Sequence, residues 1–272
     1  MNNKLTDLSP PIRFTKMHAL GNDFVVINDI EQTLILGEIA ITHLANRHTG
    51  IGFDQLLIVE PSTRADYFCR IYNADGSVAE QCGNGLRCIA RFLHEEKLIQ
   101  HSPLTIETKS GIYSLIIHDY EHIEVAMGQP TIQESLLDLT LSDCVIPITV
   151  ISIGNPHAIL KVTSVDAMVI EPLAREISTH SLFPKGANVG FMEVVDAQHI
   201  HLRTFERGVG ETHACGSNAC AAAIAGIENG WLDHKVNVEF RYGTVQIEWH
   251  DERIIMTGPA SSVFSGEITD KR

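Results

Sequence analysis

An internal duplication is the feature of this 272-residue sequence that most restricts its possible folds. Two Gly-Asn pairs, which contain Asn22 and Asn155, lie 133 residues apart, and two Cys-Gly pairs, which contain Cys82 and Cys215, have the same separation. Further along the chain the repeat continues with a separation of 132. Several matches at nearly one separation indicate that the chain consists of two halves of similar structure.

The residues around these matches predict strands and one long helix in each half. Runs of β-branched and large apolar residues at 24–28 and 56–60 predict strands. Apolar residues recur at helical spacing over 85–97. In the second half the alanine-rich segment 219–227 predicts a helix that ends before Gly230. Further short strands are expected at 104–109, 112–118, 236–241 and 244–249.

Charge and hydropathy exclude several classes of protein. With 20 Lys and Arg against 34 Asp and Glu, the net charge of -14 argues against binding to nucleic acid or to anionic membranes. The N-terminal segment lacks the apolar stretch of a signal peptide, and the longest apolar run, 145–153, contains Pro147 and is too short to span a bilayer. We therefore expect a cytoplasmic protein whose six cysteines are reduced.

The two repeated cysteines are predicted to be reactive. Cys82 and Cys215 each precede a glycine and then a predicted helix, so each thiol lies where unpaired N–H groups and the helix dipole stabilise an anion. This position lowers a thiol pKa, and the same N–H groups can bind a carboxylate. If the halves meet face to face, the two thiols flank one substrate in a cleft. The chemistry that needs this arrangement is inversion at a carbon bearing an acidic hydrogen.

The remaining cysteines, the lysines and the asparagines also fit structural roles. Cys69, Cys88, Cys144 and Cys220 are expected to be structural thiols. The separations of Cys88 from Cys82 and of Cys220 from Cys215 differ from those of usual zinc sites, so no metal is expected. The lysines lie in no recognisable phosphate-binding context, which argues against pyridoxal phosphate and leaves no expected cofactor. The asparagines after Gly21 and Gly154 are also typical of turns.

Seven motifs, in order from about residue 14 to residue 258, resemble those of the diaminopimelate epimerase family. They are Met17-His18-Ala19-Leu20-Gly21-Asn22-Asp23-Phe24, Gly52-Phe53-Asp54-Gln55, Asn73-Ala74-Asp75-Gly76-Ser77, Cys82-Gly83-Asn84-Gly85, Gly154-Asn155-Pro156-His157, Glu206-Arg207-Gly208 and Ala214-Cys215-Gly216-Ser217. The resemblance implies an isomerase that interconverts LL- and meso-diaminopimelate without cofactor or metal, in lysine and peptidoglycan-precursor biosynthesis. It also implies a homodimer.

The implied fold is α/β, with two pseudosymmetric domains and the active site in the cleft between them. Each domain is a mixed β-barrel-like sheet wrapped around a central helix. In this sequence the N-terminal half would be 12–118 plus 261–272, the C-terminal half 119–260, and 1–11 a tail.

Residue by residue, the resemblance implies that Cys82 and Cys215 are the catalytic acid and base. The implied substrate-binding residues are Asn22, Gln55, Asn73, Gly83, Asn84, Asn155, Asn188, Glu206, Arg207, Gly216 and Ser217. Two of the implied residues, His157 and Glu206, would tune the cysteine pKa values. His157 could instead be a loop histidine, and Glu206-Arg207 a surface pair.

The sequence departs from the family pattern at Ala19, Thr49, Val78, His213, Asn218 and Arg241-Tyr242-Gly243. Asn218 lies at the start of the second helix, and because asparagine is a good N-cap we expect function to be preserved. Two other functions stay open. One is a proline racemase-like isomerase, which would not need the distal set Asn73, Asn188 and Arg207. The other is a non-catalytic module that uses its thiols to bind or store metal.

Overall fold

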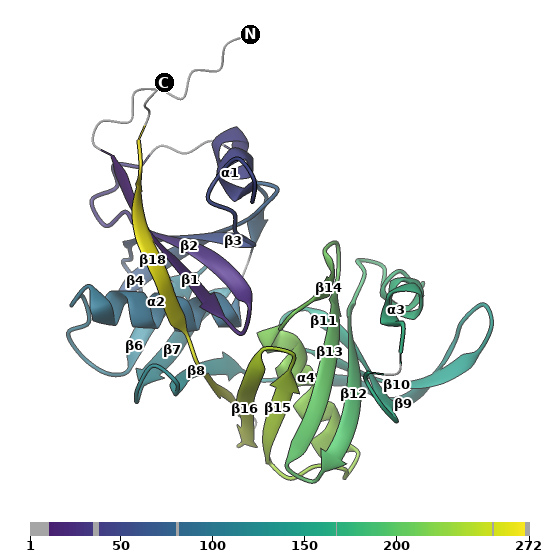
Figure 1. Ribbon diagram of the computed structural model, residues 1–272. Helices are drawn as coiled ribbons and strands as arrows, with labels where there is room; N and C mark the ends of the chain where they lie inside the picture. Colours follow the sequence, from purple (N-terminus) through teal and green to yellow (C-terminus); the bar gives the residue numbers. More distant parts are fainter. Residues whose placement is uncertain (1–10, 35–37, 80–81, 167, 252, 270–272) are drawn as a thin grey trace. The chain divides into compact units, whose positions relative to one another are not determined.

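The computed structural model describes residues 11–34, 38–79, 82–166, 168–251 and 253–269. Within them the chain is mixed α/β, mostly strands with four helices (Figure 1). The helices are α1 (Glu38–Ala45), α2 (Gly83–Glu95), α3 (Ile170–Ser178) and α4 (Gly216–Glu228). No helix in these ranges is long and apolar enough to cross a membrane.

Eighteen strands are present in the described residues, nine before residue 141 and nine after it. The first nine are β1 (Ile12–Ala19), β2 (Asn22–Asn28), β3 (Gln55–Pro61), β4 (Tyr67–Asn73), β5 (Val78–Ala79), β6 (Leu104–Thr108), β7 (Gly111–Ile117), β8 (Ile123–Gly128) and β9 (Thr131–Thr140). The others are β10 (Val145–Ser152), β11 (Pro156–Val162), β12 (Asn188–Asp196), β13 (His199–Glu206), β14 (Gly210–Thr212), β15 (Lys235–Phe240), β16 (Gly243–His250), β17 (Arg253–Gly258) and β18 (Ser261–Ile268).

The chain divides into two compact units. Of the described residues, the first unit comprises 11–19, those between Asp23 and Ile123, and 260–269. Within it the C-terminal strand β18 pairs with β1. The second comprises Leu20–Asn22 and Glu124–Pro259.

The separation of 133 residues relates the strand pairings of the two units as well as the motifs. The parallel pair β2–β3 begins with Phe24 opposite Gln55, and the parallel pair β11–β12 begins with His157 opposite Asn188, each 133 positions later. The helices α2 and α4 have 13 residues each and start 133 residues apart. Gln55 and Asn188 therefore occupy equivalent positions in the two parallel strand pairs.

In the first unit, strand β3 is buried on both faces, which explains its continuous apolar sequence. Leu56 and Ile58 pack with Ile41 of α1, whereas the Leu57 side chain lies 3.2 Å from a Cβ built on Gly85 of α2. Helix α2 also packs against β1, β7 and β18 (Figure 1). The helix that carries Cys82 at its start is thus held by strands from both ends of the chain.

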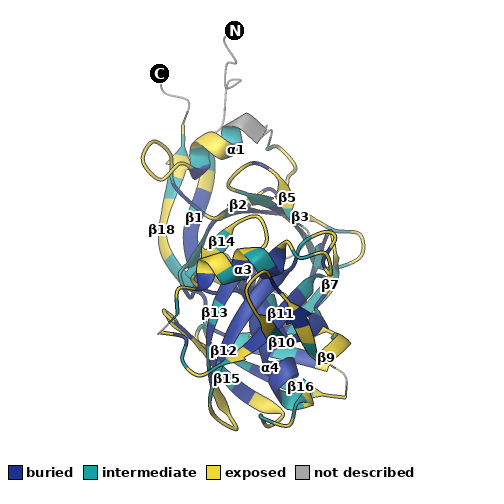
Figure 2. Ribbon diagram, turned by 90° about the vertical axis from the view of Figure 1, so that its right-hand side faces the viewer, coloured by how far each residue is buried: buried dark blue, intermediate teal, exposed yellow. Residues whose placement is uncertain are grey.

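In the second unit, helix α4 packs against β10–β13 and β15–β17. All residues from Asn218 to Gly226 are buried, and the alanines among them allow close approach of the strands. Figure 2 shows buried residues along strands such as β12 and β13, while many of the connecting turns are exposed. The start of α4, where Cys215 lies, is therefore fixed by packing on several sides.

Candidate active site

Cys82 is the N-cap of α2. Its backbone is extended, with φ -153° and ψ 105°, and its Sγ accepts a hydrogen bond from the backbone N–H of Gly85 at 3.4 Å. The thiol is partly exposed. A sulfur that accepts a backbone N–H at a helix N-terminus is in a position that favours its anionic form.

Several residues near Cys82 in the first unit are buried. Asn84 and Arg87 lie one turn apart in α2, and the guanidinium of Arg87 donates to the Oδ1 of Asn84 at 2.9 Å. Burial raises the pKa of the Cys69 and Cys88 thiols. For Cys88 the charge of Arg87 opposes this rise without cancelling it. Cys69 and Cys88 are therefore protonated, as the prediction of structural thiols requires.

Gln55 and Asn73 form an amide pair at the first position of the β3–β4 ladder. The Nε2 of Gln55 donates to the Oδ1 of Asn73 at 2.9 Å, and the Nδ2 of Asn73 donates to the Ser77 hydroxyl at 3.0 Å. The Oε1 of Gln55 is buried and has no hydrogen-bond partner among the described residues. The pair therefore offers one acceptor that a bound donor group can satisfy.

Cys215 is the N-cap of α4, with φ -130° and ψ 115°, close to the values of Cys82. Its side chain makes no capping hydrogen bond, and its Sγ lies 3.4 Å from the hydroxyl of Ser217. Cys215 is buried. The two cysteines thus share a backbone position, but the Cys82 sulfur accepts a backbone N–H whereas the Cys215 sulfur lies beside a hydroxyl.

His157 is fully buried beside Asn155. Its Nε2 lies 3.0 Å from the Oδ1 of Asn155, and its Nδ1 is buried with no hydrogen-bond partner in the part of the chain that the structure describes. Burial, with a smaller contribution from the charge of Arg207, lowers the pKa of His157 to about 3. The neutral ring donates from Nε2, which leaves the amide N–H groups of Asn155 to point elsewhere.

The low pKa of His157 predicts a pH dependence of stability. Unfolded His157 binds a proton below about pH 6.5, whereas the folded form does so only near pH 3, so its contribution is complete above pH 6.5 and is lost as the pH falls. His157→Gln should therefore flatten the decrease of Tm between pH 6.5 and 3, measured by thermal unfolding. The exposed His122→Gln serves as control; the same pH dependence in both variants would contradict this prediction.

Asn188, Arg207 and Glu206 lie together at the ends of β12 and β13. The backbone N–H of Arg207 donates to the Oδ1 of Asn188 at 2.9 Å, and its guanidinium donates to the Lys185 carbonyl at 2.8 Å. Glu206 accepts from the Thr212 hydroxyl at 2.6 Å. The exposed Arg207 is thus an oriented positive charge beside a buried asparagine.

Two departures from the family pattern contact each other. The rings of His213 and Tyr242 meet edge to face with centroids 4.7 Å apart, and a Cβ built on Gly21 would lie 2.9 Å from the Tyr242 ring. Gly21 has φ +84°, a conformation that glycine adopts readily. Tyr242 of the substituted turn therefore packs against His213, which lies two residues before Cys215.

The expectation that Asn218 acts as an N-cap is wrong. Cys215 is the N-cap, and Asn218 lies inside the first turn with its Nδ2 donating to the Val189 carbonyl of β12 at 3.0 Å. The packing of α4 on β12 directs this side chain toward the strand. Its Oδ1 is buried, and no described residue forms a hydrogen bond with it.

The predicted site residues form two sets, one in each unit. The first unit contains Gln55, Asn73, Cys82, Gly83 and Asn84, and the second contains Asn22, Asn155, His157, Asn188, Glu206, Arg207, Cys215, Gly216 and Ser217. Within the described ranges, no group of three or more His, Cys, Asp and Glu residues could hold a metal ion. Sequence reasoning missed Lys16 and Arg47, and assigned no role to Asp23 and Asp54, although these two immediately follow Asn22 and precede Gln55.

Comparisons with known proteins agree with the motifs. The diaminopimelate epimerase family model matches residues 14–133 and 149–263. Diaminopimelate epimerases of Azotobacter vinelandii and Acinetobacter baumannii are 43% and 45% identical to this chain, cover 94% of it, and are themselves covered to 99% and 97%. The crystal structure of a hydroxyproline epimerase from Agrobacterium vitis shares the fold, with a TM-score of 0.71, 15% identity, and coverage of 98% of this chain and 95% of that one. The chain therefore belongs to the diaminopimelate epimerase family of isomerases.

Proposed function

We propose that this chain interconverts LL- and meso-diaminopimelate by proton transfer at the α-carbon, with Cys82 and Cys215 as acid and base. The observation that carries the proposal is that each cysteine is the N-cap of a 13-residue helix and that the two lie 133 residues apart. Membership of the family supplies the substrate. The same membership supports a role in lysine biosynthesis, a cytoplasmic homodimer and the absence of a cofactor.

In the proposed reaction one thiolate removes the α-proton, and the electron pair of the C–H bond stays on carbon as a carbanion conjugated with the carboxylate. The opposing thiol then gives its proton to the other face of the carbon. The configuration is inverted, the first cysteine ends as a thiol and the second as a thiolate. The N–H groups at Gly83-Asn84 and Gly216-Ser217 would stabilise the charge on the carboxylate.

This mechanism needs the two thiols on opposite sides of one substrate. We infer that the two compact units are pseudosymmetric domains, each a β-barrel-like sheet around α2 or α4. The repeated strand register and the repeated helix position support this inference.

The far end of the substrate carries a second amino-acid group, and the proposed residues for it are Asn73, Asn188 and Arg207. Arg207 is suited to a carboxylate because its side chain packs along Gly186, whose built Cβ would lie 2.8 Å from the Cδ of Arg207. A guanidinium held in this way binds a carboxylate with directional, charge-assisted hydrogen bonds. Proline has no second carboxylate, so this set favours diaminopimelate over a proline-type substrate.

Arg207→Gln should raise KM for LL-diaminopimelate about 10- to 100-fold, because hydrogen bonds to charged groups contribute about 1.5–3 kcal/mol. Arg175→Gln, which removes an exposed ion pair with Glu171 in α3, is the matched control and should leave KM unchanged. An unaltered KM in Arg207→Gln would remove this residue from the proposed site. KM for LL-diaminopimelate is measured by steady-state kinetics in both variants and the wild type.

The most direct test of the function is deuterium incorporation from heavy water at the α-carbon of diaminopimelate. We expect incorporation together with inversion for LL-diaminopimelate and none for L-proline. Exchange with L-proline alone would favour a proline racemase-like enzyme. Absence of any exchange, with metal bound to the purified protein, would indicate a metal-binding module instead.

A further inference from the structure

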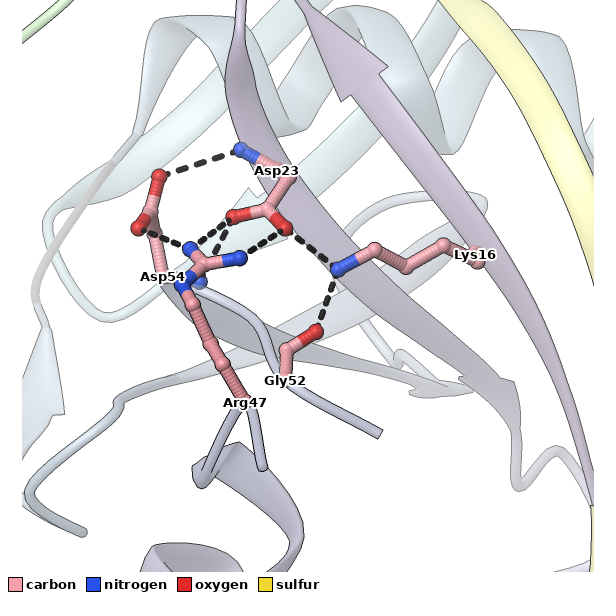
Figure 3. Close-up of polar contacts among 5 residues, drawn as sticks. All are labelled: Lys16, Asp23, Arg47, Gly52 and Asp54. Carbon is pink, nitrogen blue, oxygen red and sulfur yellow. Dashed lines mark hydrogen bonds and ion pairs between the residues drawn. The ribbon is translucent and has the colours of Figure 1, made fainter. Parts of the chain in front are cut away.

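Four charged side chains of the first unit form a connected cluster (Figure 3). The guanidinium of Arg47 binds both carboxylate oxygens of Asp23, at 2.7 and 2.8 Å, and one oxygen of Asp54 at 2.8 Å. The ammonium of Lys16 lies 2.5 Å from Asp23 and also donates to the carbonyl of Gly52. The cluster thus contains two positive and two negative groups, with Asp23 at its centre.

Backbone groups are part of the same cluster. The N–H of Asp23 donates to the carboxylate of Asp54 at 3.1 Å, and the N–H of Asp54 donates to the carboxylate of Asp23 at 3.0 Å. The parallel pairing of β2 with β3 begins at the next residues, Phe24 and Gln55. The two aspartates therefore fix where the two strands begin relative to each other.

Ionisation of Asp23 is strongly favoured. Burial alone would raise its pKa, but hydrogen bonds from Arg47 and Lys16, with their charges, hold the pKa of this carboxyl well below its usual range. Asp23 is therefore held as a carboxylate between the two cations.

The cluster is connected directly to the Gln55–Asn73 amide pair. Asp54 immediately precedes Gln55, and the carbonyl of Asp54 accepts from the N–H of Ala74, the residue after Asn73, at 3.0 Å. One residue of the cluster thus fixes the backbone on both sides of the amide pair. A purely stabilising role explains the cluster poorly, because Arg47 is half exposed and exposed ion pairs contribute little to the free energy of unfolding.

We propose that the cluster of Lys16, Asp23, Arg47 and Asp54 is a positioning device for the Gln55–Asn73 amide pair and so sets the affinity for substrate without touching it. The inference rests on the proposed function, which assigns Gln55 and Asn73 to substrate binding. Small displacements of groups that bind substrate have large effects on catalysis.

The first experiment compares Arg47→Gln with Arg64→Gln. Both arginines are exposed, at 55% and 65%, and each pairs with a carboxylate whose side chain is 14% exposed, Asp23 for Arg47 and Glu107 for Arg64. We expect Arg47→Gln to raise KM for LL-diaminopimelate at least tenfold with kcat changed less than threefold, Arg47→Lys to restore part of the affinity, and Arg64→Gln to behave as wild type. An unchanged KM in Arg47→Gln would overturn the proposal.

A double-mutant cycle tests whether Arg47 acts through the amide pair. In an Asn73→Ala background the same Arg47→Gln change should have almost no further effect on KM. If it raises KM by the same factor as in the wild type, Arg47 acts elsewhere and the proposal is wrong.

Amide hydrogen exchange separates this proposal from the proposed function. Arg47→Gln should speed exchange of the Asp54 and Ala74 N–H groups at least tenfold, whereas Arg64→Gln should leave both unchanged. If the wild type does not turn over diaminopimelate, the proposed function fails and the exchange result still decides whether the cluster fixes these residues. Unchanged exchange in Arg47→Gln would refute the positioning role.

Discussion

Cys82→Ala and Cys215→Ala should each lower kcat/KM for epimerisation of LL-diaminopimelate by at least about 1,000-fold. Each variant removes one of the two groups that exchange a proton with the α-carbon, and general acid or base catalysis contributes about 100- to 10,000-fold for each group. The other cysteine can still remove a proton and return it to the same face, so inversion should be lost in both variants. Cys144→Ala, at an exposed thiol outside the proposed site, is the control and should retain full activity.

The measurement follows inversion and deuterium incorporation in the same heavy-water reaction. Stereochemical analysis reports inversion, and mass spectrometry reports the deuterium at the α-carbon. Any deuterium gained by a single variant should appear in substrate of unchanged configuration, and the double variant should gain none. Undiminished inversion in both single variants would end the two-cysteine mechanism.

The elements that carry the cysteines could be predicted because their evidence is local. Apolar spacing in 85–97 and the alanines in 219–227 predicted the two helices, and both are confirmed, as α2 and α4. The helices begin a few residues earlier than predicted because Cys82 and Cys215 themselves adopt the extended N-cap conformation. The repeat separation could be read directly from the sequence and recurs in the strand register.

Features that depend on distant partners could not be predicted from local patterns. Strand β18 pairs with β1, more than 240 residues away. Only the family resemblance placed 261–272 with the N-terminal half, and it did not give the pairing. In the sequence Pro147 interrupts an apolar run, yet it lies in β10 opposite Asp138 of β9, outside the stretch of β10 that pairs with β11. A proline is tolerated there because β10 pairs with only one strand, β9, at this position, and no backbone N–H is needed for a second strand.

The polar contacts of the site show the same limit. The motifs include Asp23 and Asp54, but nothing in them shows that Arg47 joins the two carboxylates. The separation of Asn218 from Cys215 in the sequence places it at the start of the helix. The direction of its side chain depends on β12, to which it forms a hydrogen bond. Residue types and separations therefore indicate the chemistry, and tertiary packing decides which groups support it.

Gly190→Ala should destabilise the protein by about 1–3 kcal/mol, the usual cost of overfilling a packed core. Gly190 lies two residues after Asn188 in β12, and a Cβ built on it would lie 2.5 Å from the Oδ1 of Asn218 and 2.8 Å from the Cδ1 of Ile159. The Ile159 methyl can move, but the Asn218 amide is held by its hydrogen bond to Val189. We therefore expect the effects of substitutions at Gly190 and Asn218 on stability to depend on each other.

Asn218→Gly alone should destabilise the protein by about 1 kcal/mol, because it loses that hydrogen bond and adds a glycine to a helix. In the Gly190→Ala background the same change should instead restore stability, because it removes the oxygen that the new methyl group overlaps. Chemical denaturation of the wild type, both single variants and the double variant gives the coupling energy directly. A second pair tests specificity: Gly266→Ala, whose Cβ would lie 2.7 Å from the Phe14 ring, should not be rescued by Asn218→Gly.

A coupling energy near zero would show that the chain absorbs the new methyl group elsewhere, and Asn218 would then have no part in fixing β12 to α4. A large coupling has a functional consequence, because Asn218 lies three residues after Cys215 and Gly190 two residues after Asn188. Overlap between them should displace the start of α4 from the strand that carries Asn188. We therefore expect Gly190→Ala to lower kcat for diaminopimelate more than the loss of folded protein explains, and Asn218→Gly to recover part of that loss.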